Sequence, residues 1–216
     1  QPPTLAVMSR AHNVAQGGTG LVAYRIDETC PLHGVRVGER FFSGYPAPSE
    51  EPGLYMAFFA LGHDQGEGTP MVLEASDRAG NRGRTGFAHY IRNKRFREDT
   101  IRISDRFLSR TLPKFDAVLP AESDQSPLER FLVINRDLRK ANYRRLTEIC
   151  SRSEQTLHWQ GEFLRLPGSA RQAAFGDRRR YLYRDKAIDR QIHLGIDLAS
   201  VAQSPVPAAN AGRTVF

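Results

Sequence analysis

His193 and Asp197 are the residues whose types and spacing most clearly suit a chemical role. They lie four positions apart in a strand-like run over residues 192–199. Residues i and i+4 of a strand face the same side of a sheet. An imidazole nitrogen and a carboxylate oxygen are both zinc ligands, but a catalytic zinc takes three protein ligands plus water. Spacing alone therefore leaves two interpretations open, a structural ion pair and part of a metal site.

Two further segments accompany this pair. An FG-x-R sequence at residues 175–178 precedes it, and PVPAANAGRTVF follows it at residues 205–216. In order and spacing, the three segments closely resemble the first metal motif of LytM/lysostaphin-type zinc peptidases. Those proteins are cell-wall endopeptidases with an H-x-G-x-D motif. The resemblance covers residues 160–216 and implies that they are the first part of a β-rich peptidase domain.

The resemblance implies a role for each residue of the H-x-G-x-D motif. His193 and Asp197 become zinc ligands, and Gly195, which has no side chain, leaves room where metal and substrate approach the backbone. The substrate implied is a peptide cross-link of bacterial peptidoglycan. The metal would lower the pKa of a bound water and polarise the scissile carbonyl.

The same resemblance places Phe175, Gly176 and Arg178 close to the substrate groove. For Arg178 a structural interpretation remains open beside it. In that interpretation its guanidinium pairs with an aspartate such as Asp177 or Asp189.

One part of the family's pattern is missing from this sequence. The second motif, H-x-H, supplies the third zinc ligand and a catalytic histidine, and it does not occur here. We expect it beyond Phe216, in a segment that is a separate chain, cleaved away or absent, so the catalytic residues are unknown and this chain alone is expected to be inactive. The alternative is a degenerate, non-catalytic relative that binds cell wall or activates a partner amidase.

The chain ahead of this region divides into two predicted parts. Residues 1–92 show short apolar runs separated by turn residues and predict an immunoglobulin-like β-sandwich. The predicted strands are residues 19–26, 41–42, 54–61, 71–76 and 85–91. The turn at residues 77–81, DRAGN, resembles the last hairpin of many bacterial immunoglobulin-like domains. Residues 93–159 predict a helical connector, with a short capped helix near Ser104 and one long helix over 126–151. The long helix opens with the capping box SPLE and has a basic outer face, which suits either packing on its own protein or a membrane surface. The expected fold is therefore mainly β with a helical connector.

Composition describes an ordinary globular chain with an excess of positive charge. The 216 residues carry 31 Lys and Arg against 24 Asp and Glu, a net charge of +7, with 40% hydrophobic residues. These values exclude wholesale disorder, and the excess charge favours anionic partners such as cell-wall polymers. Nucleic acid is not an expected partner, because aromatic residues do not interleave with the basic runs. Cys30 and Cys150 leave open one disulfide or two free thiols.

The location follows from the expected substrate. Peptidoglycan lies outside the cytoplasm, so we expect a periplasmic or other cell-envelope protein. The chain begins with Gln1, and we expect a signal peptide or an anchor ahead of it. Any membrane association would then come from that anchor alone.

Overall fold

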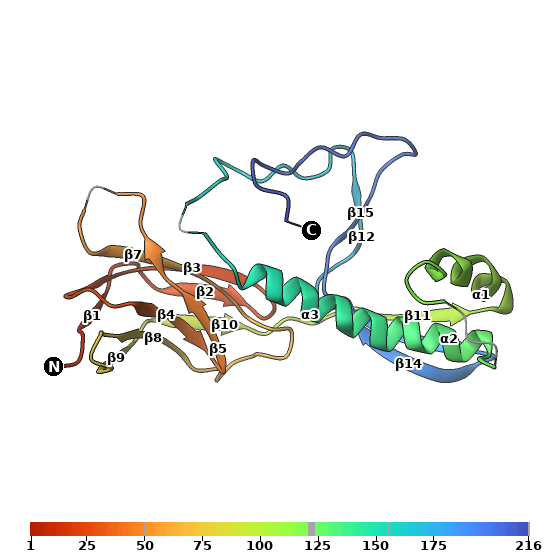
Figure 1. Cartoon of the computed structure of the whole chain (residues 1–216), viewed down its shortest axis with the longest axis horizontal. Coiled ribbons are helices and arrows are strands. Elements are labelled where there is room, and N and C mark those ends of the chain that lie inside the picture. The colour runs from red at the N-terminus through yellow and green to blue at the C-terminus, as the bar shows by residue number, and fades with distance from the viewer. Residues whose placement is uncertain (50, 121–123, 155, 216) are drawn as a thin grey trace. The chain divides into compact units, whose positions relative to one another are not determined.

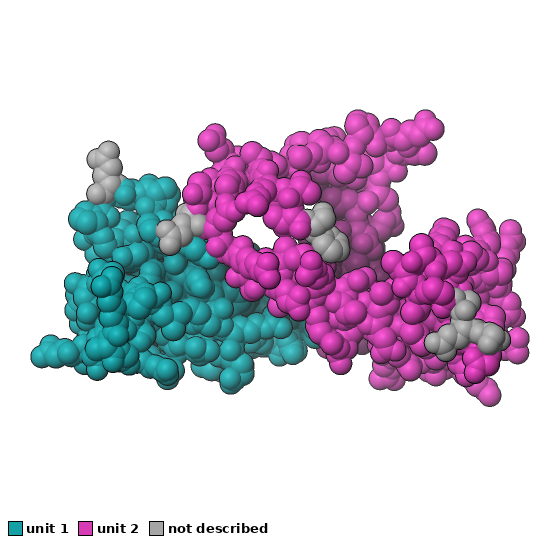
Figure 2. All heavy atoms as spheres, viewed as in Figure 1, with its two compact units in different colours: residues 1–95 teal, residues 96–216 magenta. Residues whose placement is uncertain are grey.

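A computed structural model describes residues 1–49, 51–120, 124–154 and 156–215, and the chain divides into two compact units, residues 1–95 and 96–216 (Figures 1 and 2). Within its described residues, unit 1 holds ten strands: β1 Leu5–Val7, β2 His12–Ala15, β3 Thr19–Ile26, β4 Leu32–Val37, β5 Arg40–Ser43, β6 Tyr45–Pro46, β7 Leu54–Ala60, β8 Met71–Ser76, β9 Arg82–Gly86 and β10 His89–Arg92. Unit 2 holds strands β11 Glu98–Ile103, β12 Ala170–Ala173, β13 Arg178–Tyr183, β14 Lys186–Ile192 and β15 Asp197–Ala199. Its helices are α1 Asp105–Thr111, the 3-10 turn η1 Leu112–Phe115, α2 Pro127–Val133, the π-helical segment η2 Ile134–Leu138 and α3 Arg139–Cys150.

Unit 1 is built from two four-stranded antiparallel sheets. Their strand orders are β1-β3-β7-β6 and β5-β4-β8-β9, which is the arrangement of an immunoglobulin-type sandwich. One core cluster takes buried residues from both sheets, among them Val22 and Phe59 from one and Val35 and Leu73 from the other. The mainly β prediction is confirmed, and two predicted strands, β3 and β8, have the predicted bounds.

The DRAGN turn joins β8 to β9. Gly80 adopts a φ of +86°, which glycine tolerates at no steric cost. Asn81, the other residue of this turn whose type tolerates a positive φ, does not adopt one, and its backbone N–H and side-chain amide donate to the Asp77 carboxylate at 2.8 and 2.7 Å. The predicted single strand over 85–91 is also wrong. Phe87 turns into the core between β9 and β10, and β10 pairs in parallel with β2.

Unit 2 is centred on the sheet β11-β13-β14. β11 is parallel to β13, and β13 is antiparallel to β14. Ile103 of β11, Leu108 of α1, Phe131 of α2 and Tyr181 of β13 meet in one core cluster. The predicted connector, 93–159, and the predicted peptidase segment, 160–216, therefore share a sheet and a core, and residue 160 does not separate two compact units.

The helical region begins as the capping box predicts. The Ser126 hydroxyl accepts from the Glu129 N–H at 3.3 Å, and the Glu129 carboxylate accepts from the Ser126 N–H at 2.9 Å. In place of one regular helix over 126–151, three segments follow one another, α2, η2 and α3. α2 buries Phe131, whereas no residue of α3 is buried and Leu146 is 39% exposed. The apolar residues predicted to face the protein here, Leu138, Leu146 and Ile149, are thus at most half-buried by the described residues.

The π-helical segment contacts β14 through a polar cluster. The Asn135 amide and the Arg136 guanidinium donate to the Asp189 carboxylate at 2.7 and 3.0 Å. Arg136 also donates to the carbonyl of Ile188 at 2.6 Å, and Gln191 adds a third donor to Asp189. Burial raises the pKa of Asp189, but these hydrogen bonds outweigh it and leave the pKa below its usual range. π-helical turns are frequent at functional sites. In this one, the neighbouring side chains of Asn135 and Arg136 both donate to the Asp189 carboxylate.

The two cysteines do not form a disulfide. Cys30 is buried in the sandwich, and Cys150 is exposed at the end of α3. Burial raises the pKa of the Cys30 thiol, with smaller contributions from nearby carboxylates. Cys30 therefore acts as a small apolar residue of the core.

Replacing Asp189 with alanine should lower the free energy of unfolding by about 1–3 kcal/mol at neutral pH, because it leaves the buried Asn135 amide unpaired. The folded-state pKa of Asp189 is depressed, so its contribution is present above the ordinary aspartate pKa and is lost as pH falls through the folded-state pKa. The gap between wild type and variant should therefore close in acid. Urea unfolding across pH measures it. Glu98→Ala, which removes an exposed 3.6 Å ion pair, is the control and should cost less than about 1 kcal/mol.

Candidate functional site

His193 and Asp197 meet across a connection between two strands. His193 directly follows β14, and Asp197 is the first residue of β15. The predicted single strand over 192–199 is therefore wrong, because residues 193–196 leave the ladder. The two side chains nevertheless approach, with His193 Nε2 lying 3.3 Å from Asp197 Oδ1. A loop, not strand periodicity, brings the pair together.

The turn that contains the FG-x-R sequence holds the backbone of His193 on both sides. The Gly176 N–H donates to the His193 carbonyl at 2.8 Å, and the His193 N–H donates to the Asp177 carbonyl at 2.8 Å. The buried Asp177 carboxylate closes the turn by accepting from the Ala174 N–H at 2.7 Å. Gly176 and Asp177 therefore fix the position of the His193 backbone, and with it the base of the side chain. The resemblance placed Gly176 close to substrate, and the structure places it against His193.

Gly176 is required at its position for two reasons. Its φ of +89° is one that other residues rarely adopt. A Cβ added there would also lie 2.1 Å from a ring carbon of Phe96. Gly195 is different, because an added Cβ would lie 3.8 Å from the His193 ring, which is ordinary contact.

Arg179 orients the Asp197 carboxylate. Its guanidinium donates to Asp197 Oδ2 at 3.0 Å, and its side chain is only 19% exposed. Oδ1 is then the oxygen that faces His193. Arg179 was not among the predicted site residues, because it lies inside a run of three arginines. The signal was strand alternation in β13, which turns Arg179 to the face opposite its two neighbours.

The distance between the two side chains is compatible with two ligands of one metal and with an ion pair. His193 Nε2 is buried and makes no hydrogen bond to any residue that the structure describes, so its 3.3 Å approach to Asp197 is not a hydrogen bond. Two ligand atoms at about 2.0–2.1 Å from a tetrahedral zinc lie about 3.3 Å apart. A ligating carboxylate whose second oxygen is held by an outer partner also matches metal sites in general. A protonated His193 paired with Asp197 is the other arrangement that these distances allow.

The described residues supply only two such ligands. No group of three or more His, Cys, Asp or Glu side chains within residues 1–49, 51–120, 124–154 and 156–215 is arranged to hold a metal ion. A catalytic zinc needs a third protein ligand.

Phe175 and Arg178 are the two other residues that were expected close to substrate. Phe175 is half-buried in the turn ahead of His193. Arg178 is exposed on β13, and its guanidinium lies 3.6 Å from the Glu98 carboxylate. It pairs with neither Asp177 nor Asp189, so the structural alternative for Arg178 named the wrong partners.

Two solved structures that contain immunoglobulin domains are similar to part of this chain. Neither a protein-family model nor a curated protein matches the sequence. Among solved structures, the immunoglobulin complex of titin M10 and obscurin-like 1 is 16% identical, with a TM-score of 0.31, over 44% of this chain and 97% of that one. The BIgI domain of the beta protein from S. agalactiae, solved bound to CEACAM1, is 15% identical, with a TM-score of 0.28, over 43% and 99%. The immunoglobulin-type sandwich of unit 1 is shown by its own strand order and does not depend on these similarities.

Among the described residues, no helix combines the length and the apolar character that a membrane crossing requires.

Gly176→Ala should lower the free energy of unfolding by about 1–3 kcal/mol, because the new methyl group strains the backbone and meets Phe96. Gly195→Ala is the matched control, since its Cβ finds ordinary contact and its φ is not in the left-handed region. Thermal unfolding followed by circular dichroism compares them. Equal melting temperatures for the two variants would show that the turn does not depend on Gly176.

Proposed function

We propose that this chain is the N-terminal part of a zinc metalloendopeptidase that hydrolyses peptide cross-links of bacterial peptidoglycan. The single observation that carries the proposal is the pairing of a buried, unbonded His193 Nε2 with Asp197 Oδ1 at 3.3 Å. The H-x-G-x-D sequence around these atoms supports it independently.

Each side chain has a separable task in this proposal. His193 is buried, so little water competes with a cation for its Nε2. Asp197 supplies a negative oxygen, and Arg179 holds the other carboxylate oxygen so that the first stays directed at His193. When bound, zinc would supply Lewis-acid chemistry for peptide hydrolysis. Gly176 and Asp177 hold the imidazole in position through their hydrogen bonds with the His193 backbone.

The remaining parts of the catalytic centre lie outside the described residues in this proposal. The third ligand and the catalytic histidine would come from a further segment or from a separate chain. Unit 1, as an immunoglobulin-type sandwich, would be a spacer that sets the distance between the catalytic unit and its attachment. The proposed location is the cell envelope, where peptidoglycan lies.

Zinc binding tests the ligand assignment directly. The complete protein that contains these residues should hold about one zinc per chain. His193→Ala should weaken zinc binding by at least about 100-fold, since loss of an outer partner alone typically costs 10–100-fold. Metal content after dialysis and calorimetric titration measure it.

His158→Ala is the control for that experiment, because His158 is exposed and pairs with Glu154. Equal zinc affinity in wild type and His193→Ala would overturn the assignment. Zinc binding without cleavage of cross-linked muropeptides would instead favour a non-catalytic protein that binds cell wall or activates an amidase.

A further inference from the structure

Nearly all of the excess positive charge belongs to unit 2. Residues 96–216 hold 21 Lys and Arg against 15 Asp and Glu, a formal charge of +6, whereas residues 1–95 hold 10 and 9, a charge of +1. An anionic partner is therefore attracted mainly to unit 2.

Part of this charge gathers on the outer face of the sheet β11-β13-β14. In each strand one set of alternate residues faces the core, including Ile101 and Ile103 of β11 and Tyr181 of β13. The other set faces outward, and its exposed basic members are Arg102, Arg178, Arg180 and Arg190. We refer to these four residues as the arginine face.

The centre of the arginine face is a pair of like charges. Arg180 and Arg190 are directly opposite in the antiparallel register of β13 and β14. Residues so placed have Cβ atoms about 4.5–5.5 Å apart, and like charges there are destabilising. Neither guanidinium has an ion pair with a residue that the structure describes, whereas Arg178 has Glu98 and Arg102 has Asp185. The neighbour of Arg180 on β11 is Thr100, which is exposed and uncharged.

The apolar members of this face do not favour insertion into lipid. Leu182 is buried and Ile192 is half-buried, so the face presents guanidinium groups and little apolar surface. Surfaces that bind a membrane through a sheet or helix combine basic residues with exposed large apolar ones. Charge with little apolar surface suits a hydrated polymer.

We propose that the arginine face binds the carboxylate groups of an anionic polymer, namely the peptide stems of peptidoglycan. A carboxylate between Arg180 and Arg190 would accept from both guanidinium groups and remove their mutual repulsion. Arg178 and Arg180 lie two residues apart on one strand, about 6.6 Å, so further carboxylates along the polymer would find a second cation. Arg178 is paired with Ile192, next to His193, so the face begins beside the candidate metal pair.

This inference rests on the proposed function for its choice of polymer, and its test does not use catalysis. The 216-residue chain is sedimented with purified, insoluble peptidoglycan over a range of protein and NaCl concentrations. The wild type should bind, and binding should weaken as salt rises. The double variant R180Q/R190Q should bind at least about tenfold more weakly, because two charge-assisted contacts are lost.

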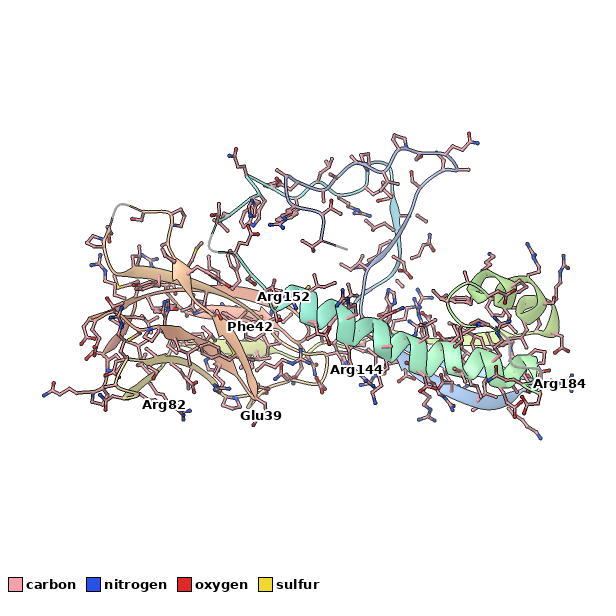
Figure 3. All side chains as sticks on the ribbon, in the orientation of Figure 1. Glu39, Phe42, Arg82, Arg144, Arg152 and Arg184 are labelled. Carbon is pink, nitrogen blue, oxygen red and sulfur yellow. The ribbon has the colours of Figure 1, made fainter. Side chains whose placement is uncertain are left out.

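The matched control is R144Q/R145Q, which removes the same charge from α3, where Arg144 is exposed (Figure 3). It should bind nearly as tightly as the wild type. R180Q/R190Q should melt at or above the wild-type temperature because a repulsive pair is gone, and Arg190→Gln alone, expected to lose about threefold, serves if the double variant does not fold. Peptidoglycan whose carboxyl groups have been converted to amides should no longer bind.

Equal loss in the two double variants, or full binding to amidated peptidoglycan, would overturn the proposal. Tighter sedimentation with phosphatidylglycerol vesicles, or with a nucleic acid homopolymer, than with peptidoglycan would overturn the choice of occupant. His193→Ala separates this proposal from the proposed function. If that variant binds zinc as the wild type does while R180Q/R190Q still loses peptidoglycan, the metal assignment alone has failed.

Discussion

The candidate site depends on two backbone hydrogen bonds that join the Gly176–Asp177 turn to His193. Both are 2.8 Å long and join buried residues of unit 2, and Gly176 has a left-handed conformation in which a side chain would meet the Phe96 ring. The imidazole position follows from them, and the Asp197 carboxylate is then set by its own partner, Arg179. The geometry thus comes from backbone constraints first and side-chain charges second.

Sequence patterns predicted the parts of the fold where a single local rule decides the structure. The strands Thr19–Ile26 and Met71–Ser76 have the predicted bounds because apolar runs there end at turn residues. The capping box at Ser126 fixed a helix start for the same reason. Patterns failed where pairing between distant residues decides. The run 192–199 has the pattern of one strand, yet its first residue ends β14, which pairs with β13, and its last three residues form β15, which pairs with β12.

The sequence singled out the two members of the candidate pair but not their supporting contacts. His193 and Asp197 were proposed as ligands because the H-x-G-x-D sequence resembles a metal motif, whereas their spacing alone left an ion pair open. Arg179 was not singled out, since strand alternation separates the middle arginine of the run from its neighbours only once residues 178–183 are known to form a strand. The partner of Arg178 was equally out of reach, because Glu98 lies 80 positions away and meets it only through the parallel pairing of β11 with β13.

That parallel pairing also shapes how the chain can fold during synthesis. The strand pairs of the two sandwich sheets all lie within residues 1–95, so the sandwich can form as soon as this part of the chain leaves the ribosome. β11 is made directly afterwards, but each of its residues must wait for one 80 positions later. Closing so long a loop is slow, and until β13 is made β11 is an unpaired strand that carries the apolar residues Ile101 and Ile103. The helices made in that interval, α1 and α2, carry the apolar residues that cover the same core, so they can shield β11 before its partner strand exists.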